Sequence, residues 1–126
     1  MRIDHIALCV RDLEAMRDFY IAHFGAVAGE LYHNPRTGLR TYFLTFDGGA
    51  RVELMQKPGA LPGGSELREG WAHLSFSLGS REAVDAATER LRAAGRAVES
   101  GPRVTGDGYY ESCVLDPEGN RVELLA

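Results

Sequence analysis

The chain repeats one short, strand-like stretch, and this internal repeat limits what the sequence can fold into. The stretch RVEL begins at residue 51 and again at residue 121. Its glutamates, Glu53 and Glu123, are 123 − 53 = 70 residues apart. Two histidines in apolar runs, His5 and His73, are 73 − 5 = 68 residues apart. A nearly constant displacement over most of a chain is typical of a duplicated structural module.

Each half of the sequence shows the same order of expected elements. Apolar residues recur at three- and four-residue steps in DLEAMRDFYIAHFG and in REAVDAATERLRAAG, which predicts two helices. Runs with alternating apolar positions predict the strands around them. The expected order is a strand at 3–10, a helix within 12–25 and strands at 26–33, 40–46 and 50–56, then a strand at 71–78, a helix at 81–95 and strands at 97–100, 109–115 and 120–126. The sequence therefore predicts an α+β fold of two βαβββ modules.

Length and composition suit one compact domain over residues 1–126. A chain of 126 residues with 44% hydrophobic content can bury a core of its own. Module one is expected at 1–57 and module two at 71–126. The segment between them, 58–70, is rich in proline and glycine and has no sustained periodicity, so we expect a mobile linker.

Charge and cysteine content narrow the partners and the compartment. The formal charge is −4 and the 14 basic residues are scattered, which argues against nucleic acid or an anionic membrane as partner and favours a small molecule. The two cysteines, Cys9 and Cys113, are far from any CxxC spacing, so neither a disulfide framework nor a thiolate zinc site is expected. The N-terminal apolar run is too short for a signal peptide or a membrane span. We expect a cytoplasmic protein.

Strand alternation places four polar side chains on matching faces. Successive side chains of a strand point to opposite faces, so Ile6 and Leu8 lie opposite to His5, and Val52 and Leu54 lie opposite to Glu53. The second half follows the same alternation. The apolar positions can pack on the helices, and the other face then carries two histidines and two glutamates, His5, Glu53, His73 and Glu123.

These four residues are a candidate metal-binding set. A single strand histidine is most often hydrogen-bonded within the protein, and a single strand glutamate is most often solvated. Matched positions in a duplicated module favour a different interpretation, because imidazole and carboxylate groups together suit a divalent metal.

Four segments resemble the signature regions of the vicinal oxygen chelate (VOC) superfamily: HIALCVRDLEAMRDFY, ARVELM, GWAHLSFSLGS and DPEGNRVELL. This superfamily includes glyoxalase I, methylmalonyl-CoA epimerase, extradiol dioxygenases and fosfomycin and bleomycin resistance proteins. The resemblance covers essentially the whole chain. It implies two modules that form a cupped mixed sheet around a divalent metal ion (Ni, Co, Zn, Mn or Fe), and usually a homodimer. The ligand positions it implies are His5, Glu53, His73 and Glu123.

The ligand set resembles that of bacterial glyoxalase I, which has a glutamate at the position of Glu53. The resemblance implies a lactoylglutathione lyase-like lyase or isomerase that transfers a proton next to a carbonyl, with one glutamate or both in turn as base. Of the two, we expect Glu123 to be the primary base and Glu53 to be a ligand that can act as second base. Cys9 and Lys57 stand where glutathione-specific members usually have arginine and asparagine, which argues against glutathione as the thiol. The alternatives are an Fe(II)-dependent extradiol-type dioxygenase and a non-catalytic protein that binds a drug or metabolite.

Overall fold

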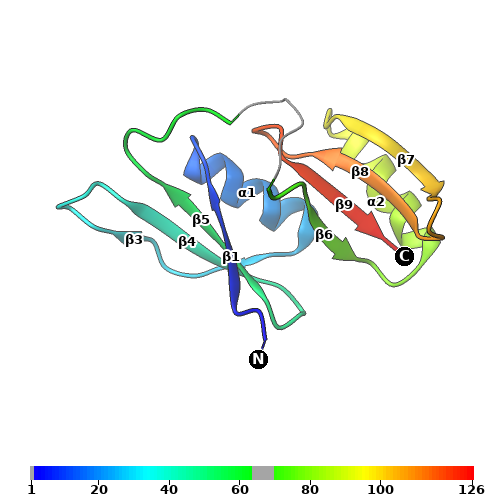
Figure 1. The fold of residues 1–126 in the computed structure, drawn as a ribbon, viewed down its shortest axis with the longest axis horizontal. Coiled ribbons are helices and arrows are strands. Elements are labelled where there is room, and N and C mark those ends of the chain that lie inside the picture. Colours follow the sequence, from blue (N-terminus) through cyan, green and yellow to red (C-terminus); the bar gives the residue numbers. More distant parts are fainter. Residues whose placement is uncertain (1, 64–69) are drawn as a thin grey trace. The chain divides into compact units, whose positions relative to one another are not determined.

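The chain forms two compact units that divide between residues 64 and 65, each with one helix and one mixed sheet (Figure 1). The computed structural model describes residues 2–63 and 70–126. The first unit contains β1 (His5–Cys9), α1 (Leu13–Phe24), β2 (Val27–Ala28), β3 (Tyr32–His33), β4 (Arg40–Thr45) and β5 (Arg51–Gln56). The second contains β6 (Leu74–Ser77), α2 (Arg81–Ala93), β7 (Val98–Val104), β8 (Tyr110–Leu115) and β9 (Arg121–Leu125). The expected α+β class is confirmed; the second unit has the order βαβββ, and the first has the same order with its second strand divided into β2 and β3.

The two sheets have the same topology. Their strand orders are β1-β5-β4-β2, with β3 also pairing with β4, and β6-β9-β8-β7. In each sheet the first and last strands of the module pair in parallel, and the remaining pairs are antiparallel. Ile6 lies opposite Val52 and Leu74 lies opposite Val122. These pairs are related by the same displacements, 68 and 70, that relate the histidines and the glutamates, so the repeat extends to strand register.

The single strand expected at 26–33 is instead two short strands separated by a β-bulge. Ala28 lies opposite Leu44 and Tyr32 lies opposite Thr41, so three residues, 29–31, face two residues of β4. An extra residue on one strand bends it and interrupts the ladder. Two smaller differences occur in the second unit: β6 begins at residue 74, just after His73, and β7 continues beyond the expected 97–100.

Both helices begin at the capping residues that the sequence offers. The Asp12 side chain accepts a hydrogen bond from the backbone nitrogen of Ala15 at 3.0 Å, and Ser80 accepts one from Ala83 at 3.1 Å. Such caps satisfy backbone donors that the first turn leaves without partners. Helix α1 ends at Gly25, whose φ of 66° lies in the left-handed region that favours glycine.

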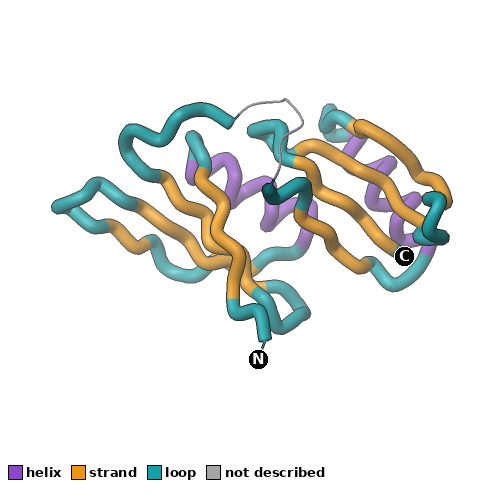
Figure 2. Tube along the Cα trace, viewed as in Figure 1, coloured by secondary structure: helices purple, strands orange, loops and turns teal. Residues whose placement is uncertain are grey.

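Each unit buries an apolar core between its helix and one face of its sheet. Helix α1 packs on β4 and β5, and α2 packs on β7, β8 and β9 (Figure 2). The most deeply buried apolar side chains of the first core are Leu13, Met16, Tyr20, Leu44 and Leu54. Those of the second core are Val84, Leu91, Val114, Val122 and Leu124. The apolar positions predicted to face the helices are buried in β5 and β9, whereas those of β1 and β6 are only partly buried.

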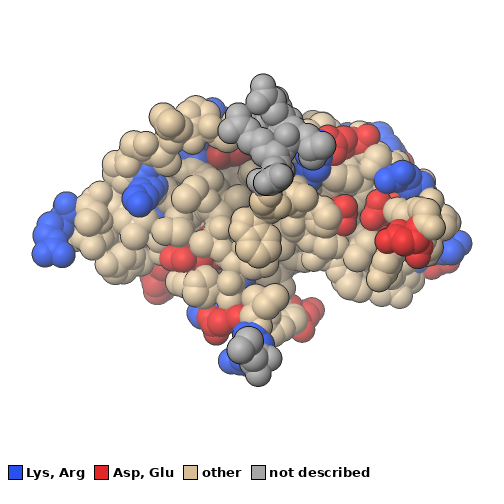
Figure 3. All heavy atoms as spheres, viewed as in Figure 1, with Lys and Arg blue, Asp and Glu red and all other residues tan. Residues whose placement is uncertain are grey.

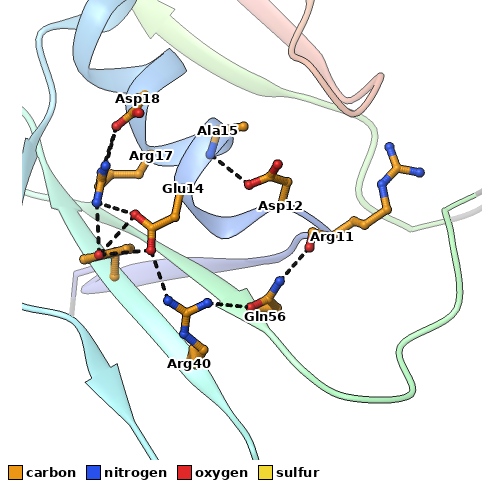
Figure 4. A network of polar contacts seen from close by, with 9 residues as sticks. Arg11, Asp12, Glu14, Ala15, Arg17, Asp18, Arg40 and Gln56 are labelled. Carbon is orange, nitrogen blue, oxygen red and sulfur yellow. Dashed lines mark hydrogen bonds and ion pairs between the residues drawn. The ribbon is translucent and has the colours of Figure 1, made fainter.

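A polar network fastens the start of α1 to the sheet of the first unit (Figure 4). Arg40 donates from Nη2 to Glu14 Oε1 and from Nη1 to Gln56 Oε1, both at 3.1 Å. Gln56 donates through Nε2 to the Arg11 carbonyl at 2.6 Å, and the Tyr42 hydroxyl donates to Glu14 at 3.3 Å. Exposed and half-exposed pairs of this kind contribute about 1 kcal/mol or less each, so the network orients the helix more than it stabilises the fold.

Neither helix of the described residues is long and apolar enough to span a bilayer. On the face shown in Figure 3, basic and acidic side chains are interspersed rather than gathered by sign. The linker expected at 58–70 includes residues 64–69, which lie outside the described residues, so its mobility stays a prediction.

We predict that alanine is far more disruptive at Gly101 than at Gly95 of the same unit. Both glycines have positive φ, 83° and 75°, which costs other residues about 1–2 kcal/mol. A Cβ at Gly101 would also lie 2.5 Å from the carbonyl oxygen of Glu111 and 2.8 Å from Cα of Ser112, whereas one at Gly95 meets nothing within 4 Å. Backbone overpacking adds about 1–3 kcal/mol. Urea unfolding should therefore show the larger loss for Gly101→Ala, and equal losses would contradict this packing.

Candidate functional site

In the first unit the parallel pairing of β1 and β5 brings His5 beside Glu53. Glu53 lies directly opposite Ala7, and His5 is two residues before Ala7, hence on the same face. His5 Nε2 is 3.9 Å from Glu53 Oε2. The glutamate side chain is 17% exposed and the histidine 40%. The carboxylate is thus the more buried partner, and the ring lies nearer to the solvent.

The second unit repeats this arrangement. Glu123 lies directly opposite Ser75, and His73 is two residues before Ser75. His73 Nε2 is 3.1 Å from Glu123 Oε2, with side-chain exposures of 41% and 19%. Of the four predicted site residues, the structure therefore joins two pairs, one in each unit. Within residues 2–63 and 70–126, no three His, Cys, Asp or Glu side chains are grouped as metal ligands would be.

Asp4 contacts the Nδ1 side of the His5 ring, and Arg51 contacts Asp4. Asp4 Oδ1 is 2.9 Å from His5 Nδ1 and accepts from Arg51 Nη2 at 2.5 Å. The hydrogen bond with His5 and then the contact with Arg51 lower the pKa of Asp4 to about 2. An ionised carboxylate can only accept, so Nδ1 of His5 carries the hydrogen, and in the neutral ring Nε2 has the lone pair. Sequence reasoning missed Asp4, although it directly precedes the predicted ligand.

Phe43 completes the surroundings of the first pair. It lies directly opposite Glu53 in the pairing of β4 with β5. The Phe43 and His5 rings lie nearly perpendicular to each other with their centroids 5.2 Å apart, and the Arg51 guanidinium lies 4.5 Å from the Phe43 ring centroid. The His5 ring is thus restrained by an aromatic neighbour as well as by Asp4.

The second pair has a thiol where the first has this aromatic ring. Cys113 lies directly opposite Glu123, the position equivalent to Phe43. Its Sγ is 3.5 Å from Glu99 Oε2, and Glu99 also accepts from Arg121 Nε at 2.6 Å and from Nη2 at 2.9 Å. The bond from Arg121 lowers the pKa of Glu99. Burial, followed by the contact with Glu99, raises the pKa of Cys113 to about 11. The second pair therefore lies beside a neutral thiol at neutral pH.

The two cysteines should differ sharply in reactivity. Cys9 is exposed and Cys113 is buried. With a pKa of about 11 against a usual value of 9.0, Cys113 has about 100-fold less thiolate at neutral pH than the same thiol in an unfolded chain. We expect iodoacetamide at pH 8 to modify Cys9 first and Cys113 at a rate at least about 100-fold below that in denaturant. Peptide mass spectrometry resolves the two, and equal rates would contradict the burial of Cys113.

The same shift predicts a pH dependence of stability. As pH rises above about 9, the unfolded chain loses the Cys113 proton while the folded chain keeps it, so the unfolded state binds fewer protons. The free energy of unfolding should therefore fall between about pH 9 and pH 11. A Cys113→Ser variant should lack this component, and urea titrations at several pH values measure it. If the free energy of unfolding of that variant falls with pH as steeply as that of the wild type, groups other than Cys113 cause the loss of stability.

Comparisons with known proteins agree with the fold. The family model of the Glyoxalase/Bleomycin resistance protein/Dioxygenase superfamily matches residues 2–124. The uncharacterized protein YqjT of Bacillus subtilis (strain 168) is 32% identical over 130 residues, covering 97% of this chain and 96% of that protein. The uncharacterized protein PA2024 of Pseudomonas aeruginosa is 34% identical over 126 residues, covering 97% of this chain and 86% of that protein.

Among solved structures, the trypanothione-dependent glyoxalase I of Leishmania major has a TM-score of 0.79 at 20% identity and covers 99% of this chain and 86% of its own. This likeness shows a shared fold. The match of the family model over residues 2–124 establishes that the chain belongs to the Glyoxalase/Bleomycin resistance protein/Dioxygenase superfamily.

Proposed function

We propose that this protein is a metal-dependent lyase or isomerase of the glyoxalase I type, which transfers a proton next to a carbonyl in a small substrate or its thiol adduct. The observation that carries the proposal is the repeated pair: each unit sets a histidine nitrogen beside a glutamate oxygen at equivalent register, at 3.9 Å and 3.1 Å. A chance ion pair has no reason to recur at equivalent positions of both modules.

The donor distances fit two ligands of one metal ion. Metal bonds to imidazole nitrogen or carboxylate oxygen are about 2.0–2.2 Å long, so two donors at tetrahedral or octahedral angles lie about 2.8–3.6 Å apart. The His73–Glu123 separation of 3.1 Å falls within this range. The His5–Glu53 separation of 3.9 Å exceeds it slightly, and a small side-chain rotation closes the difference. Each pair can therefore act as half of a metal site.

The proposed ligand set combines the pair of the first unit, His5 with Glu53, and the pair of the second unit, His73 with Glu123. The two pairs come from one chain or from two copies. Two imidazoles and two carboxylates suit Ni, Co, Zn, Mn or Fe. When bound, the metal would act as a Lewis acid toward a carbonyl oxygen and so favour removal of a proton from the adjacent carbon.

The glutamates are assigned the proton transfer. A carboxylate has two oxygens, so one can contact the metal while the other accepts a proton. Both side chains keep some exposure, 17% for Glu53 and 19% for Glu123, which leaves a path to a substrate atom. Glu123 is the proposed primary base, and Glu53 is the proposed ligand and second base. The histidines hold the metal.

The decisive experiment separates metal binding from proton transfer. Purified wild-type protein should hold a divalent metal that a chelator removes, and it should exchange the α-proton of a substrate, such as the hemithioacetal of a 2-oxoaldehyde with a thiol, with solvent deuterium. Glu123→Gln keeps an oxygen donor but loses the base, so it should keep much of its metal and lose turnover roughly 100-fold or more. Glu53→Gln should lose more of its metal.

Glu89→Gln is the matched control, because Glu89 lies on the exposed side of α2, where it pairs with Arg92. It should change neither metal content nor exchange. Full exchange with metal bound in both Glu53→Gln and Glu123→Gln would remove these residues as bases. A wild-type protein that holds no metal would instead favour a binding role.

We also propose that the protein is a homodimer. In the described part of the chain, β1 and β6 each pair with one neighbouring strand, so each unit presents a strand edge. Residues His5, Ala7 and Cys9 of β1 are exposed. Covering such edges with a second copy is a common route to closed symmetric dimers. Light scattering at micromolar concentration should give twice the 13.8 kDa mass of one chain, and a monomer mass would contradict the proposal.

A further inference from the structure

One arginine recurs in both modules beside the candidate ligands. Arg51 and Arg121 are equivalent under the repeat, and each lies two residues before a site glutamate on the same face of its strand. Each guanidinium holds a carboxylate: Arg51 donates to Asp4 at 2.5 Å, and Arg121 donates to Glu99 at 2.6 Å and 2.9 Å. The arginine is thus repeated, but its partner comes from a different part of each module.

The two carboxylates also have different second partners. Asp4 contacts Nδ1 of His5 at 2.9 Å, whereas Glu99 contacts Sγ of Cys113 at 3.5 Å. Under the displacement of 68, the position equivalent to Asp4 is Ala72, whose side chain has no acceptor. The modules therefore match in their histidine and glutamate but differ in the residue that precedes the histidine, which is Asp4 in the first and Ala72 in the second.

We infer that Asp4, held in place by Arg51, is a positioning residue that fixes the His5 ring with Nδ1 protonated and Nε2 directed toward Glu53 and the metal. This inference rests on the proposed function. Three neighbours restrain the ring: the Asp4 carboxylate at 2.9 Å, the Phe43 ring with its centroid 5.2 Å away, and Glu53 Oε2 at 3.9 Å. His73 follows Ala72, so only the first module has a carboxylate on the residue before its histidine.

The physical basis is the fixed role of each ring nitrogen. A carboxylate that accepts from one nitrogen sets the tautomer, orients the ring and strengthens the other nitrogen as a metal donor. Removing such a partner typically weakens metal binding 10–100-fold. Arg51 adds a further constraint, because it binds the Asp4 carboxylate while its guanidinium stacks on Phe43 at 4.5 Å.

The test compares Asp4→Ala with Glu99→Ala. Both variants lose one negative charge and free the equivalent arginine, but Asp4→Ala alone removes a histidine partner. The first readout uses metal-free protein at pH 8: ¹⁵N shifts of the His5 ring, assigned with a His5→Gln variant, report which nitrogen is protonated. The second is the affinity for Zn²⁺, measured by competition with a chelator. Circular dichroism checks that each variant is folded.

Asp4→Ala should shift the His5 proton from Nδ1 toward Nε2 and weaken Zn²⁺ binding 10–100-fold. Glu99→Ala should change neither, and Asp4→Asn, whose amide oxygen can still accept from Nδ1, should keep the wild-type tautomer. An unchanged tautomer in folded Asp4→Ala would overturn the inference, as would equal losses of Zn²⁺ affinity in both alanine variants. If wild-type protein binds no metal, the proposed function fails, and the tautomer alone then decides whether Asp4 positions His5.

Discussion

The parallel pairing of the first and last strands in each module is the constraint on which the rest of the structure depends. With Ile6 opposite Val52, the two strands alternate in phase, so His5 and Glu53 must share a face. A slip by one residue would turn Glu53 toward the helix and expose Leu54. Burying a leucine or valine contributes about 1.5–3 kcal/mol, whereas a half-exposed ion pair contributes about 0–1 kcal/mol. The core therefore sets the register, and the ligand geometry follows from it.

Duplication copies this geometry but not its surroundings. The ladders of the two modules are equivalent, yet Phe43 and Asp4 of the first correspond to Cys113 and Ala72 of the second. One pair is consequently restrained by an aromatic ring and a carboxylate, and the other lies beside a buried thiol. Under the proposed function, these unequal environments would be a physical basis for the two glutamates to take different roles in one reaction.

The sequence predicted the order of the elements, and it predicted that each histidine and its glutamate lie on matching strand faces, because both depend on local pattern and strand parity. It did not predict the bulge after Ala28, which is a property of pairing with β4, nor the start of β6 after His73. The Asp4–Arg51 contact joins residues 47 positions apart, so local sequence patterns do not predict it. In hindsight the signal was present, since an aspartate beside a predicted ligand and an arginine opposite it in register form a recognisable set.

The charges around the glutamates give the metal hypothesis a physical reason. A half-buried carboxylate is stabilised by a compensating positive group. Arg51 and Arg121, each two residues before a glutamate on the same strand, are engaged by Asp4 and Glu99 instead. With Nδ1 of His5 donating to Asp4, a neutral ring presents its Nε2 lone pair to Glu53. Two electron-rich groups that face each other repel unless a proton or a metal cation lies between them. Under the proposed function, a divalent ion bound between His5 Nε2 and Glu53 would remove this repulsion.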